Sequence, residues 1–497
     1  MAITAGDNLN SVPSSQQQTF SSNYLDLAST AGQGWAQQYL PDLMEREAQI
    51  YGPRTISGFL SQVGAEESMT ADQVVWSEQS RLHISLKGTI DQDGNVSSSG
   101  ASGKFTVTSD IDGNVLADGF GTSGVGDKHG VRNHDIILLS TPGVTVRALV
   151  RAVDGATIGF APYNAADASA LSETASACTL LVIGSEFKKG DNYDGTTTRG
   201  SNEATFKSFS NKPVIMKDFY SVSGSDASRI GWVEVASEMG ASGYLWYLKA
   251  EADTRARFTD YLEMTMLEAI KGSNSTVVDT ELGYSSDGLA GTEGLFAAIE
   301  DRGNVTSGVT GVNAATDLAE FDAILAEFDK QGAIEENMMF VNRATSLAMD
   351  DMLASMNSYG AGGTSYGVFQ NSEDMALNLG FSGFRRGSYD FYKSDFRYLN
   401  DLATRGGINA TAGSDAIRGV VIPAGTSTVY DQQVGQNMRR PFLHVRYRAS
   451  QTDDRRMKSW VTGSVGAATS ALDAMEIHML TERCLITQGA NNFMLMK

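Results

Sequence analysis

Residues 245–271 read LWYLKAEADTRARFTDYLEMTMLEAIK and carry the longest helical pattern in this chain of 497 residues. Apolar residues recur along one face of that pattern, at Leu245, Leu248, Ala252, Phe258, Leu262, Met266 and Ile270. The helical candidate reaches back to Ser228, and a continuous helix over residues 228–271 would be about 66 Å long. Three glycines weaken its first half, namely Gly231, Gly240 and Gly243. We therefore expect a break or a late start, and a C-terminal cap at Gly272.

The residues that follow the long helix alternate between helical and strand patterns. Leu318–Phe328 predicts a helix closed by Gly332, Met338–Val341 a short buried strand, and Leu347–Met356 a further helix. Shorter strands are expected later, around Tyr389–Tyr392, Gly419–Ile422, Phe442–Tyr447 and Met475–Ile486. This alternation predicts a mixed α/β region that ends in β structure.

Upstream of the long helix, residues 81–163 show a period of two. Apolar residues alternate with polar ones in three runs, at Leu82, Ile84 and Leu86, at Phe105 and Val107, and at Val144, Val146 and Leu149. Asp-Gly pairs, which supply the positive φ of tight hairpin turns, stand at Asp93-Gly94, Asp112-Gly113, Asp118-Gly119 and Asp154-Gly155. The region is predicted to be a module of antiparallel hairpins.

Two further segments read as extensions rather than packed domains. Residues 185–225 are rich in glycine and lysine and predict an extended hairpin. Residues 1–40 form a polar arm, which we expect to lie on another surface such as a neighbouring subunit. Helical stretches are expected at Pro41, in a first-turn position, and at Ser57–Val63.

The composition excludes several classes of protein. The formal net charge is −21, and a sequence-reading nucleic-acid binder normally carries a basic patch instead. Cys178 and Cys484 are too few for a disulfide framework and are expected to be buried and reduced. No apolar run approaches the ~18 residues of a membrane helix. The first forty residues lack Lys, Arg and an apolar core, so no secretory signal is expected and the chain should work or assemble in a cytoplasm.

A near-repeat of acidic residues is the sharpest local motif. Asp91–Val96 reads DQDGNV and Asp110–Val115 reads DIDGNV. Such carboxylates and the Asn oxygen could hold Ca²⁺, but the glycine is fourth rather than sixth as in an EF-hand loop. Hairpin turns explain the same residues without a metal, because Asp side chains bind turn amides. The turn interpretation is favoured, and calcium is the minor alternative.

The remaining candidates for chemistry are isolated. His129 and His134 lie five residues apart beside Asp127 and Asp135, without an evident third ligand. The other histidines, His83, His444 and His478, are expected to be packed or on the surface. No nucleophile elbow, Walker loop or dinucleotide fingerprint occurs. The many carboxylates leave a two-carboxylate glycosidase formally open. We assign no catalytic, cofactor or metal residue and expect no enzyme.

The order of these segments resembles the major capsid proteins of tailed bacteriophages, which have the Hong Kong 97 (Johnson) fold. Val74–Arg81 resembles the end of the N-terminal arm, Ile183–Gly190 and Lys212–Phe219 the two limbs of the E-loop, and Ser228–Lys271 the spine helix. Met339–Asn342 followed by Thr345–Met356 resembles the strand–helix step of the axial domain, and Met475–Phe493 the last peripheral strands.

The resemblance implies an α+β fold with an inserted β-rich domain. It divides the chain into an N-terminal arm and helices (1–80), the insertion (81–175), an E-loop (176–227), a peripheral domain with the spine helix (228–275), an axial domain (276–438) and peripheral return strands (439–497). Some relatives cross-link an E-loop lysine to an asparagine of a neighbour. Lys188 and Lys189 lie in that region, but no asparagine can be assigned.

The function implied by the resemblance is that of a major capsid protein. It would self-assemble as hexamers and pentamers into an icosahedral shell around double-stranded DNA, which it contacts without sequence specificity. Implied partners are a scaffolding protein, the portal, and decoration or head-fibre proteins, with no membrane. The implied location is the virion, after assembly in the host bacterial cytoplasm. An encapsulin-like shell protein and a β-rich glycan-binding phage structural protein are the alternatives.

Overall fold

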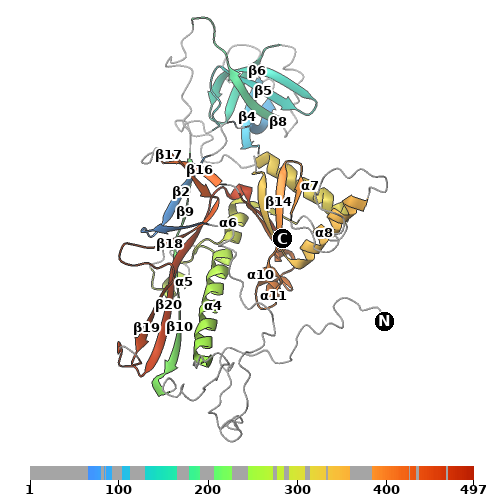
Figure 1. Ribbon diagram of the computed structural model, residues 1–497. Coiled ribbons are helices and arrows are strands. Elements are labelled where there is room, and N and C mark those ends of the chain that lie inside the picture. Colours follow the sequence, from blue (N-terminus) through green and yellow to red (C-terminus); the bar gives the residue numbers. More distant parts are fainter. Residues whose placement is uncertain are drawn as a thin grey trace. The chain divides into compact units, whose positions relative to one another are not determined.

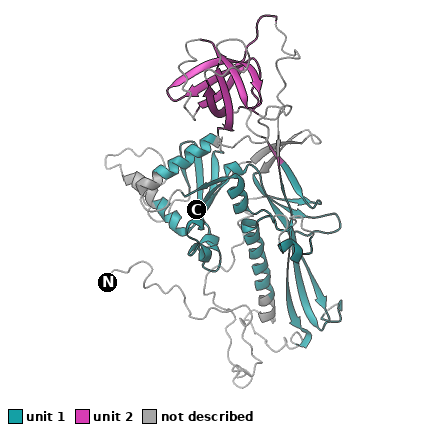
Figure 2. Ribbon diagram, turned by 180° about the vertical axis from the view of Figure 1, so that it is seen from behind, with its two compact units in different colours: residues 1–76, 209–497 teal, residues 77–208 magenta. Residues whose placement is uncertain are grey.

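The computed structural model resolves into two compact units (Figures 1 and 2). One unit, here the barrel unit, comprises residues 77–208, and the other, here the body, comprises residues 1–76 and 209–497. The described residues are 65–79, 83, 85–91, 103–111, 129–164, 178–190, 206–225, 245–272, 277–284, 290–307, 314–331, 334–358, 383–424, 426–431, 436–465 and 468–497. The expected polar arm and the helices near Pro41 and Ser57–Val63 lie outside them.

The barrel unit is built around a closed antiparallel barrel in the order β3-β4-β7-β6-β5-β8. Its strands are β3 (Ser85–Asp91), β4 (Gly103–Asp110), β5 (Asp135–Thr141), β6 (Val144–Asp154), β7 (Thr157–Pro162) and β8 (Cys178–Ser185). The period of two arises because alternate side chains point into the barrel. Leu86, Phe105, Val107 and Val146 are all buried inside it, so the prediction of antiparallel strands is confirmed for these residues.

One expected hairpin turn can be examined directly. Asp154-Gly155 connects β6 to β7, with Asp154 paired to Thr157 and Gly155 at φ +55°. A side chain at that φ would be strained, which explains the glycine. The prediction is confirmed for this pair, whereas the Asp-Gly pairs at residues 93, 112 and 118 lie outside the described residues.

The expected hairpin between Ile183–Gly190 and Lys212–Phe219 is wrong. The first segment begins in β8, which pairs with β3 and β5 and so closes the barrel. The second segment lies in β10 (Val214–Ser223), which pairs along its whole length with β20 (Ala474–Thr487). Alternation correctly marked both segments as extended, but alternation identifies a face and not a partner strand. The barrel therefore extends past residue 175 into the segment assigned to the E-loop.

The body contains a long sheet in the order β1-β18-β20-β10, with β19 also paired to β20. Besides β10 and β20, its strands are β1 (Ala65–Met69), β18 (Leu443–Arg448) and β19 (Lys458–Gly463). β1 runs parallel to β18, and the other pairs are antiparallel. The predicted strand over Met475–Ile486 is confirmed as β20. Within Val74–Arg81, expected as the end of an arm, the strand β2 (Val74–Gln79) pairs with β9 (Phe206–Asn211), and residues 80–81 lie outside the described residues.

The long helix is α4 (Leu245–Glu268), which lies beside β10 and β20 (Figure 1). Phe258, Leu262 and Met266 are buried as predicted, whereas Ala252 and Ile270 are exposed. The helix ends at Glu268, so the prediction of a cap at Gly272 is wrong. The chain leaves the helix because the Ala269 carbonyl accepts the Gly294 N–H at 2.7 Å, and Gly272 donates to the Ala290 carbonyl at 2.8 Å. Residues 228–244 lie outside the described residues.

A second, six-stranded sheet of the body has the order β11-β21-β15-β12-β14-β13. Its strands are β11 (Asn304–Thr306), β21 (Met494–Met496), β15 (Gly419–Pro423), β12 (Glu336–Val341), β14 (Tyr389–Asp395) and β13 (Gly383–Arg386). Helices α7 (Ala314–Gln331) and α8 (Arg343–Ser358) bury Phe321, Phe328 and Met349 against one of its faces. The predicted strand–helix step is thus confirmed, and Gly332 lies outside the described residues.

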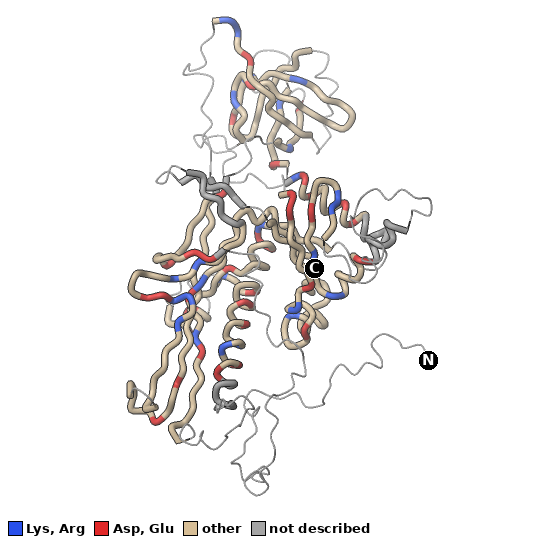
Figure 3. The backbone as a smooth tube through the Cα atoms, viewed as in Figure 1, with Lys and Arg blue, Asp and Glu red and all other residues tan. Residues whose placement is uncertain are grey.

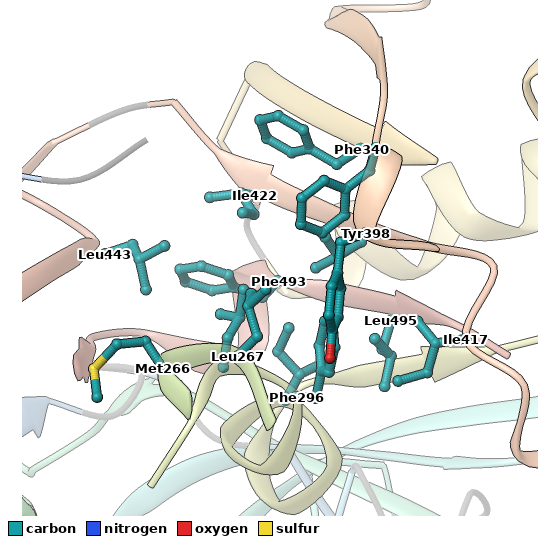
Figure 4. Close-up of a cluster of buried hydrophobic side chains, with 14 of the residues drawn as sticks. Met266, Leu267, Phe296, Phe340, Tyr398, Ile417, Ile422, Leu443, Phe493 and Leu495 are labelled. Atoms are coloured by element: carbon teal, nitrogen blue, oxygen red, sulfur yellow. The ribbon is translucent and has the colours of Figure 1, made fainter. Parts of the chain in front are cut away.

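The two sheets of the body share one central core (Figure 4). Met266 and Leu267 from α4, Leu443 from β18 and Leu495 from β21 meet there around the fully buried Phe493. Helix α6 (Leu295–Arg302) closes this core. The smaller elements of the body are α5 (Val277–Glu281), α10 (Arg397–Asn400), α11 (Arg405–Asn409), η3 (Gly413–Asp415), η4 (Ala490–Asn492), β16 (Thr426–Asp431) and β17 (Gln436–Pro441).

Candidate assembly surface

The two histidines considered as metal ligands, His129 and His134, make local contacts within the barrel unit. His129 is buried, its Nε2 donates to the Gly155 carbonyl at 2.9 Å and its Nδ1 accepts the Val131 N–H at 3.0 Å. His134, at φ +69°, stacks on Phe187. Both rings are therefore engaged locally. His444 is buried in β18, His478 is part-buried in β20 and His83 is exposed, as predicted.

The described residues contain no group of three His, Cys, Asp or Glu placed to hold a metal ion. Most of the two acidic near-repeats lies outside these residues. Cys178 and Cys484 are free and buried, as predicted. Burial raises the pKa of the Cys484 thiol to about 12 and raises that of Cys178 as well. Both thiols are thus protonated and inert near neutral pH.

Among the helices in the described part of the chain, none has the length and apolarity that spanning a membrane requires. The described residues instead expose large apolar side chains, and these are distributed unevenly. Only Tyr163 and Ile183 of this set belong to the barrel unit. All the others belong to the body, among them Val277, Val278 and Leu282 in and just after α5. The candidate functional surface therefore lies on the body.

The most organised part of this surface is an aromatic ladder across three strands of the long sheet. Phe219 of β10, His478 of β20 and Trp460 of β19 occupy directly opposed positions. Their rings stack, with centroids 6.2 Å apart for Phe219 and His478 and 5.3 Å apart for Trp460 and His478. Phe219 is 59% exposed and Trp460 38% exposed. Cross-strand aromatic pairs stabilise a sheet, but half-exposed ones also present a flat apolar surface.

The ladder lies on the face of the sheet that points away from α4. Asp218 is next to Phe219 and therefore points to the opposite face. Its carboxylate lies 3.7 Å from the guanidinium of Arg257 in α4. On the ladder's own face, β10 adds exposed Ile215 and Lys217. One face of the long sheet is thus packed against α4 at β10 and β20, while the other face presents apolar and basic side chains to solvent.

A network of ion pairs fixes the N-terminal strand β1 to the same sheet. Glu66 pairs with Arg456 and, at 3.0 Å, with Arg483, and Glu67 pairs with Arg446 at 2.8 Å. We refer to these three arginines as the arginine seat. Figure 3 shows acidic and basic positions side by side along these strands. Burial lowers the pKa of Arg483, and the neighbouring Glu66 opposes that shift.

Sequence reasoning did not find the arginine seat. The sequence pattern that points toward it is the alternation of Arg446 and Arg448 with apolar residues in β18. Such alternation is typical of a strand with one charged face. The acidic partners precede these arginines by several hundred residues, so no local pattern joins them. Lys188 and Lys189, considered for cross-linking, are exposed, and the described contacts assign no asparagine to them.

No protein-family model matches the sequence, and no curated protein matches it. Among solved structures, a chain of Microbacterium phage Oxtober96 is similar at 10% identity, over 95% of this chain and 99% of that chain, with a TM-score of 0.36. A chain of Mycobacterium phage Bobi is similar at 8% identity, over 91% and 95%, with a TM-score of 0.35. A chain from the asymmetric unit of the bacteriophage PhiM1 mature capsid is similar at 9% identity, over 63% and 79%, with a TM-score of 0.31.

These solved structures are of phage origin, as the resemblance noted in the sequence predicts. At such TM-scores the chains share only part of their arrangement in space. What this chain does is therefore argued from its own surfaces.

Proposed function

We propose that this chain is the major capsid protein of a tailed bacteriophage, a non-enzymatic subunit of an icosahedral shell. The observation that carries the proposal is the ladder face of the long sheet, where Phe219 and Trp460 are exposed opposite the face that α4 covers. Exposed apolar surface of this kind marks a contact with another molecule. In a closed symmetric shell, such faces are buried by neighbouring copies of the same chain.

In this proposal the chain has the α+β Hong Kong 97 (Johnson) architecture. Residues 228–275 and 439–497 contribute the peripheral domain, residues 276–438 the axial domain, and the β-rich region that begins near residue 81 is an insertion. Hexamers and pentamers enclose double-stranded DNA with the help of a scaffolding protein and a portal. The acidic net charge of −21 suits this role, because like charge prevents tight binding of the packaged phosphates.

The experiment is to express the full chain with a candidate scaffolding partner and to measure particle mass by light scattering with negative-stain images. Closed shells of megadalton mass, or discrete pentamers and hexamers, support the proposal. A monomer of 53.1 kDa with and without the partner contradicts it. In that case glycan binding by the barrel unit, the alternative class, becomes the next measurement.

A pair of matched variants tests whether the ladder face is the contact. Phe219→Ser removes an exposed ring from the body, and Ile183→Ser removes a similarly exposed apolar side chain from the barrel unit. Ile183→Ser is expected to alter folding stability by less than about 0.5 kcal/mol, because the side chain is exposed. Phe219→Ser should cost up to about 1 kcal/mol, because it also removes the stacking on His478. Only Phe219→Ser should reduce the yield of particles. An equal loss with Ile183→Ser would show that the ladder is not the specific contact.

A further inference from the structure

Three separate segments of the barrel unit meet at one place, just outside the ends of their strands. His134 precedes β5, Tyr163 follows β7, and Glu186 and Phe187 follow β8. The Tyr163 hydroxyl donates to the Glu186 carboxylate, and the Glu186 N–H donates to the His134 carbonyl at 3.1 Å. The His134 ring stacks on Phe187, with centroids 5.1 Å apart. We refer to these four residues as the barrel-end cluster.

The backbone of the cluster holds one side chain in an unfavourable conformation. His134 has a φ of +69° and is the one non-glycine residue with a positive φ in the described part of the chain. Its neighbours fix this turn, because the Arg132 N–H donates to the Asp135 carboxylate at 2.9 Å and the His134 N–H donates to the Val150 carbonyl at 3.0 Å. Strain of this kind is concentrated at positions with a role beyond folding. The position of the His134 ring therefore points to such a role.

Tyr163 presents an open aromatic face in a fixed orientation. Its side chain is 54% exposed, while its hydroxyl is tied to Glu186. Partial burial and the Glu186 carboxylate raise the pKa of Tyr163 to about 12, so the hydroxyl remains a donor near neutral pH. Glu186 is itself exposed, and the two oxygens of an ionised carboxylate can accept further hydrogen bonds. The cluster thus offers a flat apolar face beside a hydrogen-bond acceptor.

The charges around the cluster favour an uncharged ligand. Lys188 and Lys189 follow the cluster directly in the sequence and are exposed, as is Glu186. A strongly anionic or cationic ligand would meet like charge as well as opposite charge there, and like charges brought together weaken binding.

The cluster is also too small an apolar surface for a protein partner. In the described part of the barrel unit, Tyr163 and Ile183 are the only large apolar side chains that are exposed. A stable protein interface buries about 800 Å² on each partner around an apolar centre. A sugar ring needs far less, because its C–H groups can pack on one aromatic face while its hydroxyls donate to a carboxylate.

We propose that the barrel-end cluster binds a neutral pyranose sugar. Tyr163 is the stacking platform, Glu186 accepts the sugar hydroxyls, and the stacked His134 and Phe187 rings provide a second aromatic surface. The proposal is binding without hydrolysis, because glycosidases use a pair of carboxylates and the cluster contains one. It goes beyond the proposed function and does not depend on it, since the barrel unit has a core of its own.

The test is saturation-transfer NMR on the full chain with a panel of soluble neutral oligosaccharides built from hexoses, N-acetylhexosamines and deoxyhexoses. We expect saturable binding of at least one of them with a Kd in the millimolar range, since one ring and a few hydrogen bonds supply only a small free energy. If no member of the panel binds saturably, the proposal is wrong.

A matched pair of tyrosine variants locates the site. Tyr163→Ala should weaken binding at least tenfold, whereas Tyr392→Ala, at a 52% exposed tyrosine of the body, should leave it unchanged. An equal loss in both variants would mean that the sugar stacks on tyrosines unselectively. Protection of the buried Cys178 thiol from a labelling reagent shows whether the barrel remains folded. Should Tyr163→Ala unfold the barrel, Tyr163→Phe decides, because it keeps the ring and should weaken binding several-fold.

A variant of the strained residue tests the second aromatic surface. His134→Asn removes the ring and suits a positive φ, so binding should fall several-fold while Cys178 stays protected. Unchanged binding would overturn the role assigned to His134. Particles that form without binding sugar reject the site and leave the shell intact, while sugar binding by a chain that never assembles rejects the shell and leaves the site intact.

Discussion

The barrel unit and the body differ in how many large apolar side chains they expose to solvent. The barrel closes on itself, so it has no free strand edges, and its core consists entirely of its own side chains. Tyr163 and Ile183 are its only large exposed apolar residues in the described part of the chain. The body has an open long sheet with a helix on one face and the aromatic ladder on the other.

This difference separates a unit whose described apolar side chains are nearly all buried from one that exposes many of them. Under the proposed function, a neighbouring copy would bury Phe219 and Trp460 of the long sheet, and that burial would stabilise the contact. Each unit also contains one buried thiol, Cys178 in the barrel and Cys484 in the body. These two thiols report separately on the opening of each unit.

The largest effect is expected from Phe105→Ala, which leaves a cavity in the barrel core. Phe105 is fully buried, and its loss should cost about 3–5 kcal/mol. The rate at which a thiol reagent labels Cys178 at pH 8 should rise about a hundredfold to several thousandfold, since each 1.4 kcal/mol is a factor of ten. Labelling of Cys484 should not change, because its raised pKa and its burial belong to the body.

The reciprocal variant is Phe493→Ala, which removes a fully buried ring from the central core of the body. It should expose Cys484 and leave Cys178 protected, with a loss of similar size. If either variant exposes both thiols together, the two units unfold cooperatively, which would contradict the view that each unit is stabilised by its own core.

The sequence predicts the local helices and strands well here, but it predicts poorly which strands pair with each other. The core face of α4 at Phe258, Leu262 and Met266 follows from helical spacing, and the barrel strands follow from alternation. The pairing of β1 with β18 joins residues about 380 apart in the chain, and no local period contains that information. The misassigned hairpin has the same origin, because β8 and β10 are both alternating strands whose partners are set by three-dimensional closure.

The next largest effect is expected at Asn211, a buried side chain of the body at the turn between β9 and β10. Its amide donates to the Leu485 carbonyl at 2.6 Å and the Glu293 carbonyl at 3.0 Å, and its oxygen accepts the Lys212 N–H at 2.8 Å and the Glu293 N–H at 2.9 Å. Asn211→Ala leaves these backbone groups unpaired and should cost about 2–4 kcal/mol. Chemical denaturation followed by Cys484 labelling measures it.

Asn211→Asp provides the matched control, because it keeps the accepting oxygen and removes the two donated bonds. It should also place a carboxylate against two carbonyl oxygens, so its cost should be at least that of the alanine variant. Protection of Cys178 should be unchanged in both variants. A loss of Cys178 protection would mean that the turn also stabilises the barrel, which would weaken the contrast between the two units.

The smallest effect is expected at two tyrosines that each donate a hydrogen bond to a carboxylate but differ in burial. Tyr389 in the body is 5% exposed and donates to Asp329 at 2.6 Å, and Tyr163 in the barrel unit is 54% exposed and donates to Glu186. Burial and the adjacent carboxylate raise the pKa of each to about 12. Tyr389→Phe should therefore cost about 1 kcal/mol at pH 7, and Tyr163→Phe less than about 0.5 kcal/mol.

The pH dependence of the tyrosine variants has a defined sign. A tyrosine that ionises near pH 10 in the unfolded chain and near pH 12 in the folded chain binds its proton more tightly when folded. Its contribution to stability is complete below pH 10 and is lost as the pH rises through 12. The cost of Tyr389→Phe, measured by urea denaturation at pH 7 and 11, should therefore shrink at the higher pH. A cost that stays constant would show that folding does not raise the pKa of Tyr389.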